Sequence, residues 1–459
     1  MPTKTTDVDP LTKALEPPPD ETPVQREERL RAEAEAKYIS DIIDEELERQ
    51  KTAEKKAPKS LKVLLLGQSE SGKSTTLKNF QIMYDPKAFK AERALWRAVI
   101  QLNVVRSVHL ILDAMTSAQI EAQSSSSEPQ PELSQELLKL QKRLAPLLQV
   151  EQTLTRRLTP VGSGESEATL LNPNSSYADR SKSLSKEVAI NSGSAWKGAF
   201  SKMLGGDDQR GIVDADPSVN WNDPNDPCVV LSACAQDIAL LWNDPIVRQL
   251  LRRQKLRLEE MAGFFLESLD RVTAPDYLPT DDDVLRARLK TLGVSEHRFK
   301  ISSKLERYAV ASYTPAWVPY FDDMDAIIFL APISAFDQAL AEDTEVNRLE
   351  DSVNLWKYIV SNKLLKDTSL ILFLNKTDIM KDKLSSGIKF SDFVVSYGTR
   401  PNDFENTSQS GVLKEKSIVP RTFYCHFTAV TDIQSTKSIL TNVSEVLMRR
   451  NLADAALLS

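Results

Sequence analysis

The segment LKVLLLGQSESGKST, residues 61–75, decides the fold of this chain. The mainly apolar run Leu61–Leu66 ends at Gly67, which is typical of a buried parallel strand. Residues 67–74 then match the pattern G-x-x-x-x-G-K-[S/T], and helical sequence follows. A strand, this loop and a helix in this order predict a phosphate-binding loop, and a chance match on an ordinary turn is the less favoured alternative.

The residue types in this loop suit the chemistry of a polyphosphate. Gly67 and Gly72 leave space for backbone amides to surround phosphate oxygens. Lys73 adds a positive charge at the β and γ positions, and Ser74 offers a hydroxyl to Mg2+. The loop therefore predicts a nucleoside triphosphate as the ligand.

A second motif, Asn375-Lys376-Thr377-Asp378, follows the apolar run at residues 370–374. An aspartate at the end of such a strand can accept hydrogen bonds from the ring N–H and the exocyclic amine of guanine, whereas adenine offers no such pair of donors. The N-K-x-D string alone is weak evidence, because Asn and Asp are ordinary turn formers at strand ends. Together with the loop at Gly67, and in this chain order, it predicts GTP.

A third stretch, Asp283–Gly293, reads DVLRARLKTLG and lies between these two motifs. Its basic residues just ahead of Thr291 could place a cation on the γ-phosphate and a second hydroxyl on Mg2+. Read in isolation, the same stretch is a solvated helix end.

The composition excludes several classes of protein. Only 14 of the 459 residues are glycine, about 3% against a typical value of roughly 7%, which favours a helix-rich globular chain. The net charge of -7 argues against a nucleic acid as the main partner. The three cysteines and three histidines show neither disulfide-framework nor zinc spacing, so a reducing compartment is expected. No uninterrupted apolar run approaches the length of a membrane span.

Strand and helix patterns alternate along much of the chain. Apolar runs at Asp325–Ala331, Ser369–Leu374 and Thr422–Thr428 predict further buried strands. Helical periodicity is present at Val346–Asn362 and Ser435–Asn451. This alternation predicts βαβ units and a mainly parallel sheet.

Two segments interrupt the alternation. Ala91–Met115 and Ile238–Val272 are predicted to be helical, and Leu133–Leu158 between them has leucines spaced for an amphipathic helix. The Ser-, Pro- and Asn-rich composition of Thr159–Asp226 predicts a low-complexity insertion without fixed structure.

The N-terminal sixty residues form a separate segment. Residues 1–20 are predicted to be disordered, and residues 21–60 to form a charged helix with one apolar stripe. The stripe favours docking of a partner, and packing on the chain itself is the alternative.

Several of these motifs resemble the α subunits of heterotrimeric G proteins. The stretches that carry the resemblance are GQSESGKST, YLPTDDDVLRARLKTLG from Tyr277, LAEDTEVNRLEDSVNLW from Leu340, FLNKTD, and the C-terminal part from HFTAVTD to NLADAALLS. The resemblance covers the chain from about Asp41 to its end, apart from the insertion. It implies an α/β fold: a Ras-like P-loop GTPase domain with a mainly parallel six-stranded sheet, interrupted by an inserted all-α helical domain. The GTPase domain would comprise residues 61–90 and 277–459, and the helical domain residues 91–276.

The resemblance also implies roles for individual residues. Gly67 and the segment Glu70, Ser71, Gly72, Lys73, Ser74 and Thr75 would hold the phosphates, and Ser74 with Thr291 would coordinate Mg2+. Leu285, Arg286, Ala287 and Arg288 would line the ribose and phosphates. Arg288 would act as an arginine finger, so that Lys73 and Arg288 are the predicted catalytic residues. Asn375, Lys376 and Asp378 would read guanine, with Val430 in the turn that closes over the base.

The implied partners are those of the family. The N-terminal helix would meet a βγ dimer, and the last helix with its tail, Ser435–Ser459, would meet a seven-helix receptor; receptor and effector stay unnamed. Pro2 stands where myristoylation needs glycine. We therefore expect a cytoplasmic protein at the inner face of the plasma membrane, with peripheral membrane contact through its partners, and no nucleic acid ligand.

The chain departs from the family in the segment that serves hydrolysis. The family has a D-x-G-G-Q segment in which a glycine N–H senses the γ-phosphate and the glutamine orients water. Residues 294–317 contain no glycine, glutamine or aspartate, and Ser69 occupies a loop position that is usually glycine. The hypothesis is a signal transducer that binds GTP and GDP but hydrolyses GTP slowly. The alternatives are a normally hydrolysing GTPase, a nucleotide-independent scaffold and, least favoured, a P-loop ATPase or kinase.

Overall fold

The computed structural model describes residues 22–56, 62–123, 133–158, 189–191, 223–254, 256–292, 294–302, 305–311, 324–340, 343, 345–409, 423–443 and 445. From residue 290 to residue 311 it describes the course of the backbone and not the side chains. The chain divides into two compact units, Met1–Ser60 and Leu61–Ser459.

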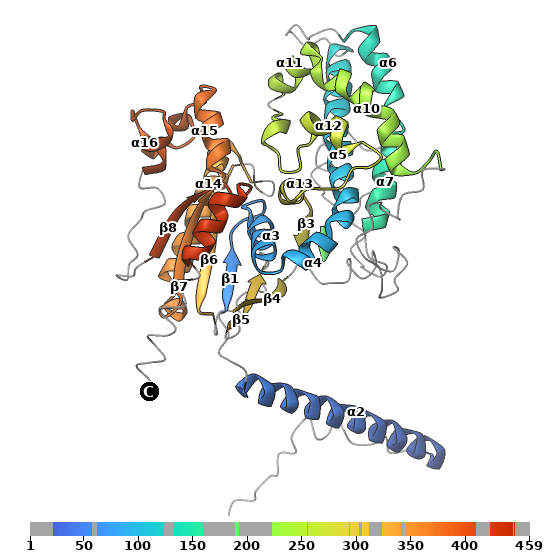
Figure 1. The fold of residues 1–459 in the computed structure, drawn as a ribbon, viewed down its shortest axis with the longest axis vertical. Coiled ribbons are helices and arrows are strands. Elements are labelled where there is room, and N and C mark those ends of the chain that lie inside the picture. Colours follow the sequence, from blue (N-terminus) through green and yellow to red (C-terminus); the bar gives the residue numbers. More distant parts are fainter. Residues whose placement is uncertain are drawn as a thin grey trace, which may run out of the picture. The chain divides into compact units, whose positions relative to one another are not determined.

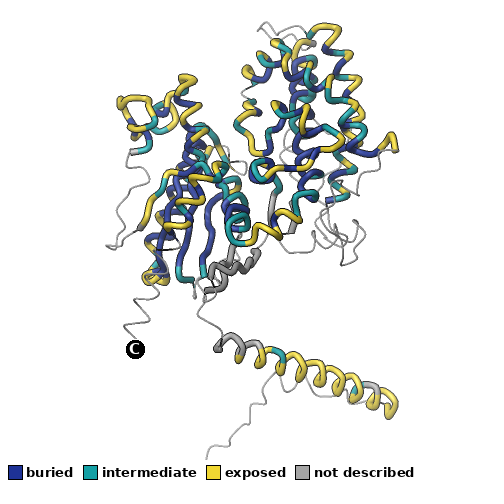
Figure 2. Tube along the Cα trace, viewed as in Figure 1, coloured by how far each residue is buried: buried dark blue, intermediate teal, exposed yellow. Residues whose placement is uncertain are grey.

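The first unit contains one long helix, α2 (Pro23–Lys56). A reciprocal cap starts it: the Thr22 backbone N–H donates to Gln25 Oε1 over 3.1 Å, and the Gln25 N–H donates to Thr22 Oγ1 over 3.4 Å. Its apolar side chains are about half exposed. They are Leu30, Tyr38, Ile39, Ile42, Ile43 and Leu47. The predicted N-terminal helix is therefore present, with its apolar stripe open to solvent within this unit (Figure 2).

A parallel sheet forms the centre of the second unit. Its strands are β1 (Val63–Leu66), β6 (Ala326–Pro332), β7 (Ser369–Asn375) and β8 (Phe423–Thr428), hydrogen-bonded in the order β1-β6-β7-β8 (Figure 1). All residues of β1, β6 and β7 are buried. The four apolar runs found in the sequence are these four strands, and their parallel pairing is confirmed.

The predicted count of six strands is wrong for the described residues. The main sheet has four strands, while β4 (Val294–Ser302) and β5 (Leu305–Ala311) form an antiparallel ladder of their own. This ladder has two register shifts, between His297 and Lys300 and between Lys300 and Ser302. The two strands hydrogen-bond each other, and among the described backbone segments no ladder joins β5 to β1.

Helices cover both faces of the main sheet, which is why its strands are continuously apolar. On one face, Phe80 of α3 (Lys73–Tyr84) and Leu440 of a helix at 433–443 pack against β1, β6 and β7. On the other, Trp356 of α14 (Arg348–Ser361) and Met380 of α15 (Thr377–Ser385) fill the second cluster. The predicted helix Ser435–Asn451 is present in its first part, and residue 444 and those beyond 445 lie outside the described residues.

A helical bundle lies between α3 and β3 in the chain (Figure 1). Its long helix α5 (Arg93–Gln123) packs against α7 (Leu147–Leu158), α10 (Pro227–Asn243) and α11 (Pro245–Arg253). The bundle is completed by α4 (Pro86–Ala91), α6 (Gln135–Arg143), α12 (Leu269–Val272) and α13 (Asp281–Arg286). Residues Arg93–Ala122 are long and apolar enough to span a membrane, although scattered polar residues interrupt the apolar sequence. However, 72% of the apolar window is buried, as expected for the core helix of a bundle.

Two stretches predicted as single helices are each broken. Ile238–Val272 is interrupted at Asp244. The Asp244 side chain accepts hydrogen bonds from the N–H groups of Ile246 and Val247 and so caps the start of α11. Pro245 suits the first position of this new helix but would disrupt the interior of a continuous one. Leu133–Leu158 is likewise divided into α6 and α7 around Pro146.

The predicted insertion, Thr159–Asp226, lies mostly outside the described residues. Its described parts are residues 223–226 and β2 (Ala189–Asn191). β2 pairs in parallel with β3 (Lys290–Leu292), and Ile190 stands opposite Thr291 in the register.

Candidate functional site

The motif residues meet at the carboxyl ends of the parallel strands. Gly67 follows β1, Asn375 ends β7 and Thr428 ends β8, and Asn375 and Thr428 are direct neighbours in the register. Ligands of open α/β sheets bind at this edge. The sheet therefore brings together motifs that are about 300 residues apart in the sequence.

The loop after β1 has a backbone that requires its glycines. Gly67 and Gly72 have φ values of 143° and 104°, and Glu70 adopts 58°. A Cβ on Gly67 would collide with the Leu330 carbonyl oxygen, and one on Gly72 with the Asn375 amide. Glycine is therefore required at both positions, because the backbone has a positive φ and neighbouring atoms leave no space for a Cβ. The next residue, Lys73, begins α3. The N-terminal amides of α3, which form the positive end of the helix dipole, therefore face the loop.

Asn375 ties this loop to the end of β8. Its Nδ2 donates to the Ser71 carbonyl oxygen over 2.7 Å, while its Oδ1 accepts from Thr428 Oγ1 at 3.1 Å and from the Val430 N–H at 3.2 Å. The side chain is fully buried. In this structure Asn375 therefore holds the loop and the turn at Val430 in register with each other.

Lys73 lies inside the loop without an anionic partner among the described residues. Its Nζ donates to the carbonyl oxygens of Gly67 at 2.8 Å and Gln68 at 2.6 Å. Burial, together with the nearby charge of Arg348, lowers the pKa of Lys73 to about 7. Ser71 Oγ and Gln68 Oε1 beside it are buried and have no hydrogen-bond partner among the described residues. The Lys73 ammonium and the Ser71 hydroxyl can both donate, so these two groups fit a loop that receives an anion with several acceptor oxygens.

Three more cations surround the same loop. Arg288 pairs with Glu70 Oε1, and Arg348 donates to Glu70 Oε2 over 2.9 Å. Burial alone would raise the pKa of Glu70, but Arg288, Arg348 and Lys376 hold it at about 2. Burial, together with the nearby charges of Arg348 and Arg288, lowers the pKa of Lys376 to about 8, although the charge of Glu70 acts in the opposite direction. Three of these cations, Arg288, Arg348 and Lys376, act on the one carboxylate of Glu70, and Lys73 lies beside them. We call Lys73, Arg288, Arg348, Lys376 and Glu70 the loop cluster.

The helical bundle holds the backbone beside Arg288. Asn103 of α5 accepts from the Arg288 N–H at 2.8 Å and donates to the Arg288 carbonyl oxygen at 2.9 Å. The Gly263 N–H donates to the Arg286 carbonyl oxygen over 3.1 Å. At Gly263 (φ 84°) a Cβ would press on Asn103 and Arg288. Sequence reasoning missed both residues; the available signal was a lone Asn in the middle of an apolar helix.

α3 and α13 are fastened to each other on the bundle side of the loop. Lys78 Nζ donates to the carbonyl oxygens of Val284 at 2.7 Å and Ala287 at 3.0 Å, and it lies 4.1 Å from the centre of the Trp96 ring. Burial lowers the pKa of Lys78 to about 7. Thr75 Oγ1 donates to the Leu285 carbonyl oxygen over 3.5 Å. These contacts fix the segment that carries Arg288 relative to the loop.

The remaining predicted site residues are placed as follows. Leu285, Ala287 and Val430 are buried, whereas Arg286 points outward and pairs with Asp282 at 3.0 Å. Asp378 is exposed in the first turn of α15, and Ser74 lies in the first turn of α3. The Thr291 side chain lies outside the described part of the chain.

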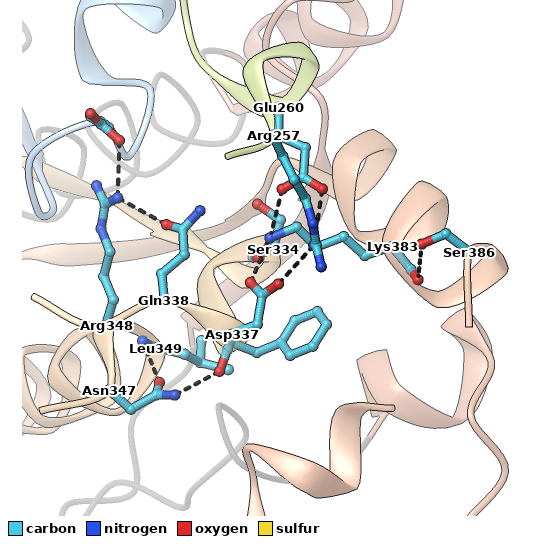
Figure 3. A network of polar contacts seen from close by, with 12 residues as sticks. Arg257, Glu260, Ser334, Asp337, Gln338, Asn347, Arg348, Leu349, Lys383 and Ser386 are labelled. Carbon is cyan, nitrogen blue, oxygen red and sulfur yellow. Dashed lines mark hydrogen bonds and ion pairs between the residues drawn. The ribbon is translucent and has the colours of Figure 1, made fainter. Parts of the chain in front are cut away.

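A second polar network connects the bundle to the sheet (Figure 3). Lys383 of α15 is 1% exposed and pairs with Asp337 at 2.5 Å and with Glu260 at 3.0 Å. Arg257 pairs with Asp337 at 3.0 Å and with Glu260 at 3.2 Å. Two cations therefore face two carboxylates; we call Arg257, Glu260, Asp337 and Lys383 the joining network.

Comparison with known proteins agrees with this geometry. The profile of the family described as G-protein alpha subunit matches residues 37–447. The chain belongs to the G protein α subunit family. It is 30% identical to the guanine nucleotide-binding protein alpha-4 subunit of Mycosarcoma maydis, over 97% of this chain and 94% of that protein. It is 28% identical to the alpha-1 subunit of the same organism, over 93% of this chain and 98% of that protein, and 27% identical to a G protein alpha subunit of Coprinellus congregatus, over 92% and 97%.

Family membership supports the predicted class of ligand and of process. This G protein α subunit is a guanine nucleotide-binding protein of G protein signalling. The family implies association with βγ dimers and with receptors in general. Residues 294–317, in which the sequence lacks the D-x-G-G-Q segment of the family, comprise β4, β5 and residues 303–304 and 312–317, which lie outside the described residues.

Proposed function

We propose that this α subunit binds GTP and GDP with Mg2+ at the loop cluster and hydrolyses GTP slowly. The observation that carries the proposal is the charge of the site: four cations converge on a glycine-constrained loop at the start of a helix, while the carboxylates that contact the loop in the described residues are Glu70 and Asp351, the latter through Gln68. A nucleotide polyphosphate supplies the missing negative charge. The N-K-T-D motif beside it supplies the selectivity for guanine.

Each residue has a role that follows from its position. The loop amides from Glu70 to Thr75 and the Lys73 ammonium hold the phosphates, and Arg288 moves onto the terminal phosphate as the arginine finger. Lys376 and Asp378 face the base, while Asn375 holds the loop and the Val430 turn together. Leu285 and Ala287 act through their backbone, since their side chains are buried.

Mg2+ would be held by hydroxyl groups and phosphate oxygens. Among the described residues no group of three His, Cys, Asp or Glu side chains is arranged to hold a metal ion. The Ser74 hydroxyl at the start of α3 has the chemistry that hard cations prefer, and Thr291 is the proposed second ligand. The ion would neutralise charge that develops on the phosphates.

Slow hydrolysis follows from residues that the sequence lacks. Between residues 294 and 317 there is no glutamine to orient water and no glycine whose N–H could sense the γ-phosphate. Phosphate and guanine contacts do not depend on that segment, so the protein keeps its affinity for the nucleotide although GTP hydrolysis is slowed. Ser69 adds a side chain where the family usually has none.

The proposed partners are a βγ dimer at α2 and a seven-helix receptor at the C-terminal helix and tail. The exposed apolar side chains of α2 support the first. The proposed location is the cytoplasmic face of the plasma membrane, reached through these partners.

A nucleotide exchange and hydrolysis time course tests the proposal. We expect stoichiometric Mg-GTPγS binding that GDP displaces and ATP does not, with slow release of phosphate from GTP. Arg288→Ala should lower the hydrolysis rate further and leave GDP affinity within a few-fold. Failure of Mg-GTPγS to raise the melting temperature would instead favour a nucleotide-independent scaffold, and turnover at the ordinary rate of the family would contradict slow hydrolysis.

A further inference from the structure

Arg348 contacts the phosphate loop from a helix that carries none of the sequence motifs for nucleotide binding. It is the first residue of α14, directly after the N-cap Asn347, and its side chain is 14% exposed. Its Nη1 donates to Glu70 Oε2 at 2.9 Å and to Gln338 Oε1 at 3.0 Å, and its Nη2 donates to the Ser69 carbonyl oxygen (Figure 3 shows the Gln338 contact). α14 is thereby attached to two consecutive residues of the loop.

The position is electrostatically unfavourable for a cation. The first turn of a helix is the positive end of its dipole. Arg348 also contributes, after burial, to the lowered pKa of Lys73, and it acts in the same direction on Lys376. Within the loop cluster, Glu70 is the residue with which Arg348 interacts favourably. The role of Arg348 therefore depends on its contact with this carboxylate.

Glu70 is shared between two arginines. Arg288 holds Oε1 and Arg348 holds Oε2, on a residue whose backbone has a positive φ of 58°. In the proposed function, Arg288 leaves Glu70 when it moves to the terminal phosphate. If Glu70 had no other partner, this largely buried carboxylate would be left unpaired in the GTP-bound protein, which costs free energy.

We propose that Arg348 is a positioning residue that keeps Glu70 and Ser69 in place when Arg288 moves from Glu70 to the terminal phosphate. Arg348 thereby sets the preference of the site for GTP over GDP, without touching the reacting atoms. With GDP, Arg288 and Arg348 both pair with Glu70; with GTP, Arg348 is the arginine that stays paired with it. This inference rests on the proposed function, that a guanine nucleotide binds at the loop cluster.

The test is the ratio of GTPγS to GDP affinity, measured with Mg2+ by competition against a fluorescent guanine nucleotide. Arg348→Ala should lower GTPγS affinity about tenfold and GDP affinity less than about twofold, because only the triphosphate draws Arg288 away. Arg348→Lys keeps the charge beside Glu70 and should recover most of the ratio. Arg143→Ala removes a 58% exposed arginine paired with Asp237 and should leave the ratio at its parental value.

A double variant separates this role from general support of the loop. In a Glu70→Gln background no carboxylate is left unpaired, so adding Arg348→Ala should change the ratio less than about twofold. Equal losses of GDP and GTPγS affinity in Arg348→Ala would overturn the proposal, as would the same tenfold loss in the double variant. A parental protein that binds neither nucleotide would overturn the proposed function itself, and with it this inference.

Discussion

The loop cluster and the joining network are built from the same kinds of side chain, but their charges are balanced differently. In the joining network, Lys383 and Arg257 face Asp337 and Glu260, and each cation contacts both carboxylates. In the loop cluster, three cations act on Glu70, and Lys73 has no anionic partner among the described residues. Charges that are paired within the protein need no ligand, and removing one of them is costly, whereas an unbalanced set of cations can be neutralised by an anionic ligand. From this difference we infer a structural role for the joining network and a ligand-binding role for the loop cluster.

The largest expected effect is on stability in the joining network. Lys383→Met should lower the free energy of unfolding by about 3 kcal/mol, because Asp337 and Glu260 lose their buried cation and keep only Arg257, which is 42% exposed. Chemical denaturation of the nucleotide-free protein measures this. Lys366→Met removes a lysine that is 76% exposed and should change stability by less than about 0.5 kcal/mol. Equal effects of the two variants would contradict the structural role of Lys383.

The opposite behaviour is expected at Lys73. Lys73→Met should lower GDP affinity by about 100-fold, since a charged contact to phosphate is lost. It should not destabilise the nucleotide-free protein, because the buried ammonium has no anionic partner there among the described residues. Calorimetric titration and thermal unfolding of the same samples separate the two effects. A destabilised protein with normal affinity would reverse the assignment of roles.

The lowered pKa of Lys73 predicts a specific pH dependence. Its folded pKa of about 7 lies below the value of 10.5 for an exposed lysine, so the unfolded chain binds more protons between these pH values and this group makes stability rise with pH. Binding of phosphates restores the proton, so GDP affinity should fall above pH 7 by up to about tenfold per pH unit. Titration in buffers of different ionisation enthalpy should show proton uptake with GDP. Guanosine, which has no phosphate, should show none.

The smallest expected effect concerns the neutral residue that holds Arg288. Asn103→Ala leaves the Arg288 N–H and carbonyl oxygen without their partner, and we expect a loss of about 1–2 kcal/mol in stability. Nucleotide dissociation should become several-fold faster, as measured by release of a fluorescent GDP analogue. Asn243→Ala is the matched control, since Asn243 is exposed and donates to the Ala239 carbonyl oxygen of its own helix. Identical release rates for both variants would show that Asn103 does not position Arg288.

Local motifs predicted much of the site and of the sheet. The loop at Gly67, the strand before Asn375 and the four parallel strands follow from short patterns in which neighbours in sequence are neighbours in space. The strand count was wrong because it came from the resemblance, and β4 and β5 pair with each other. The helix boundary at Asp244 depends on a single capping side chain, which the pattern of apolar residues does not reveal.

The residues that complete the site come from distant parts of the chain. Arg348 is 278 residues from Glu70, and Asn103 is 185 residues from Arg288. Neither lies in a motif, and each acquires its role only when the sheet and the bundle are assembled. The available signals were weak: an Asn within an apolar helix, and an Arg at the start of a helix where the dipole disfavours it.

Single-turnover hydrolysis of GTP bound to the full-length protein tests the central claim most directly. The loop cluster predicts that Mg-GTP binds in a one-to-one complex, and the residues missing between 294 and 317 predict that its phosphate is released far more slowly than the rate of about 10⁻² s⁻¹ typical of α subunits. Tight binding with a rate below about 10⁻⁴ s⁻¹ would agree with the account. Hydrolysis at the ordinary rate, or no binding of GTP, would contradict it.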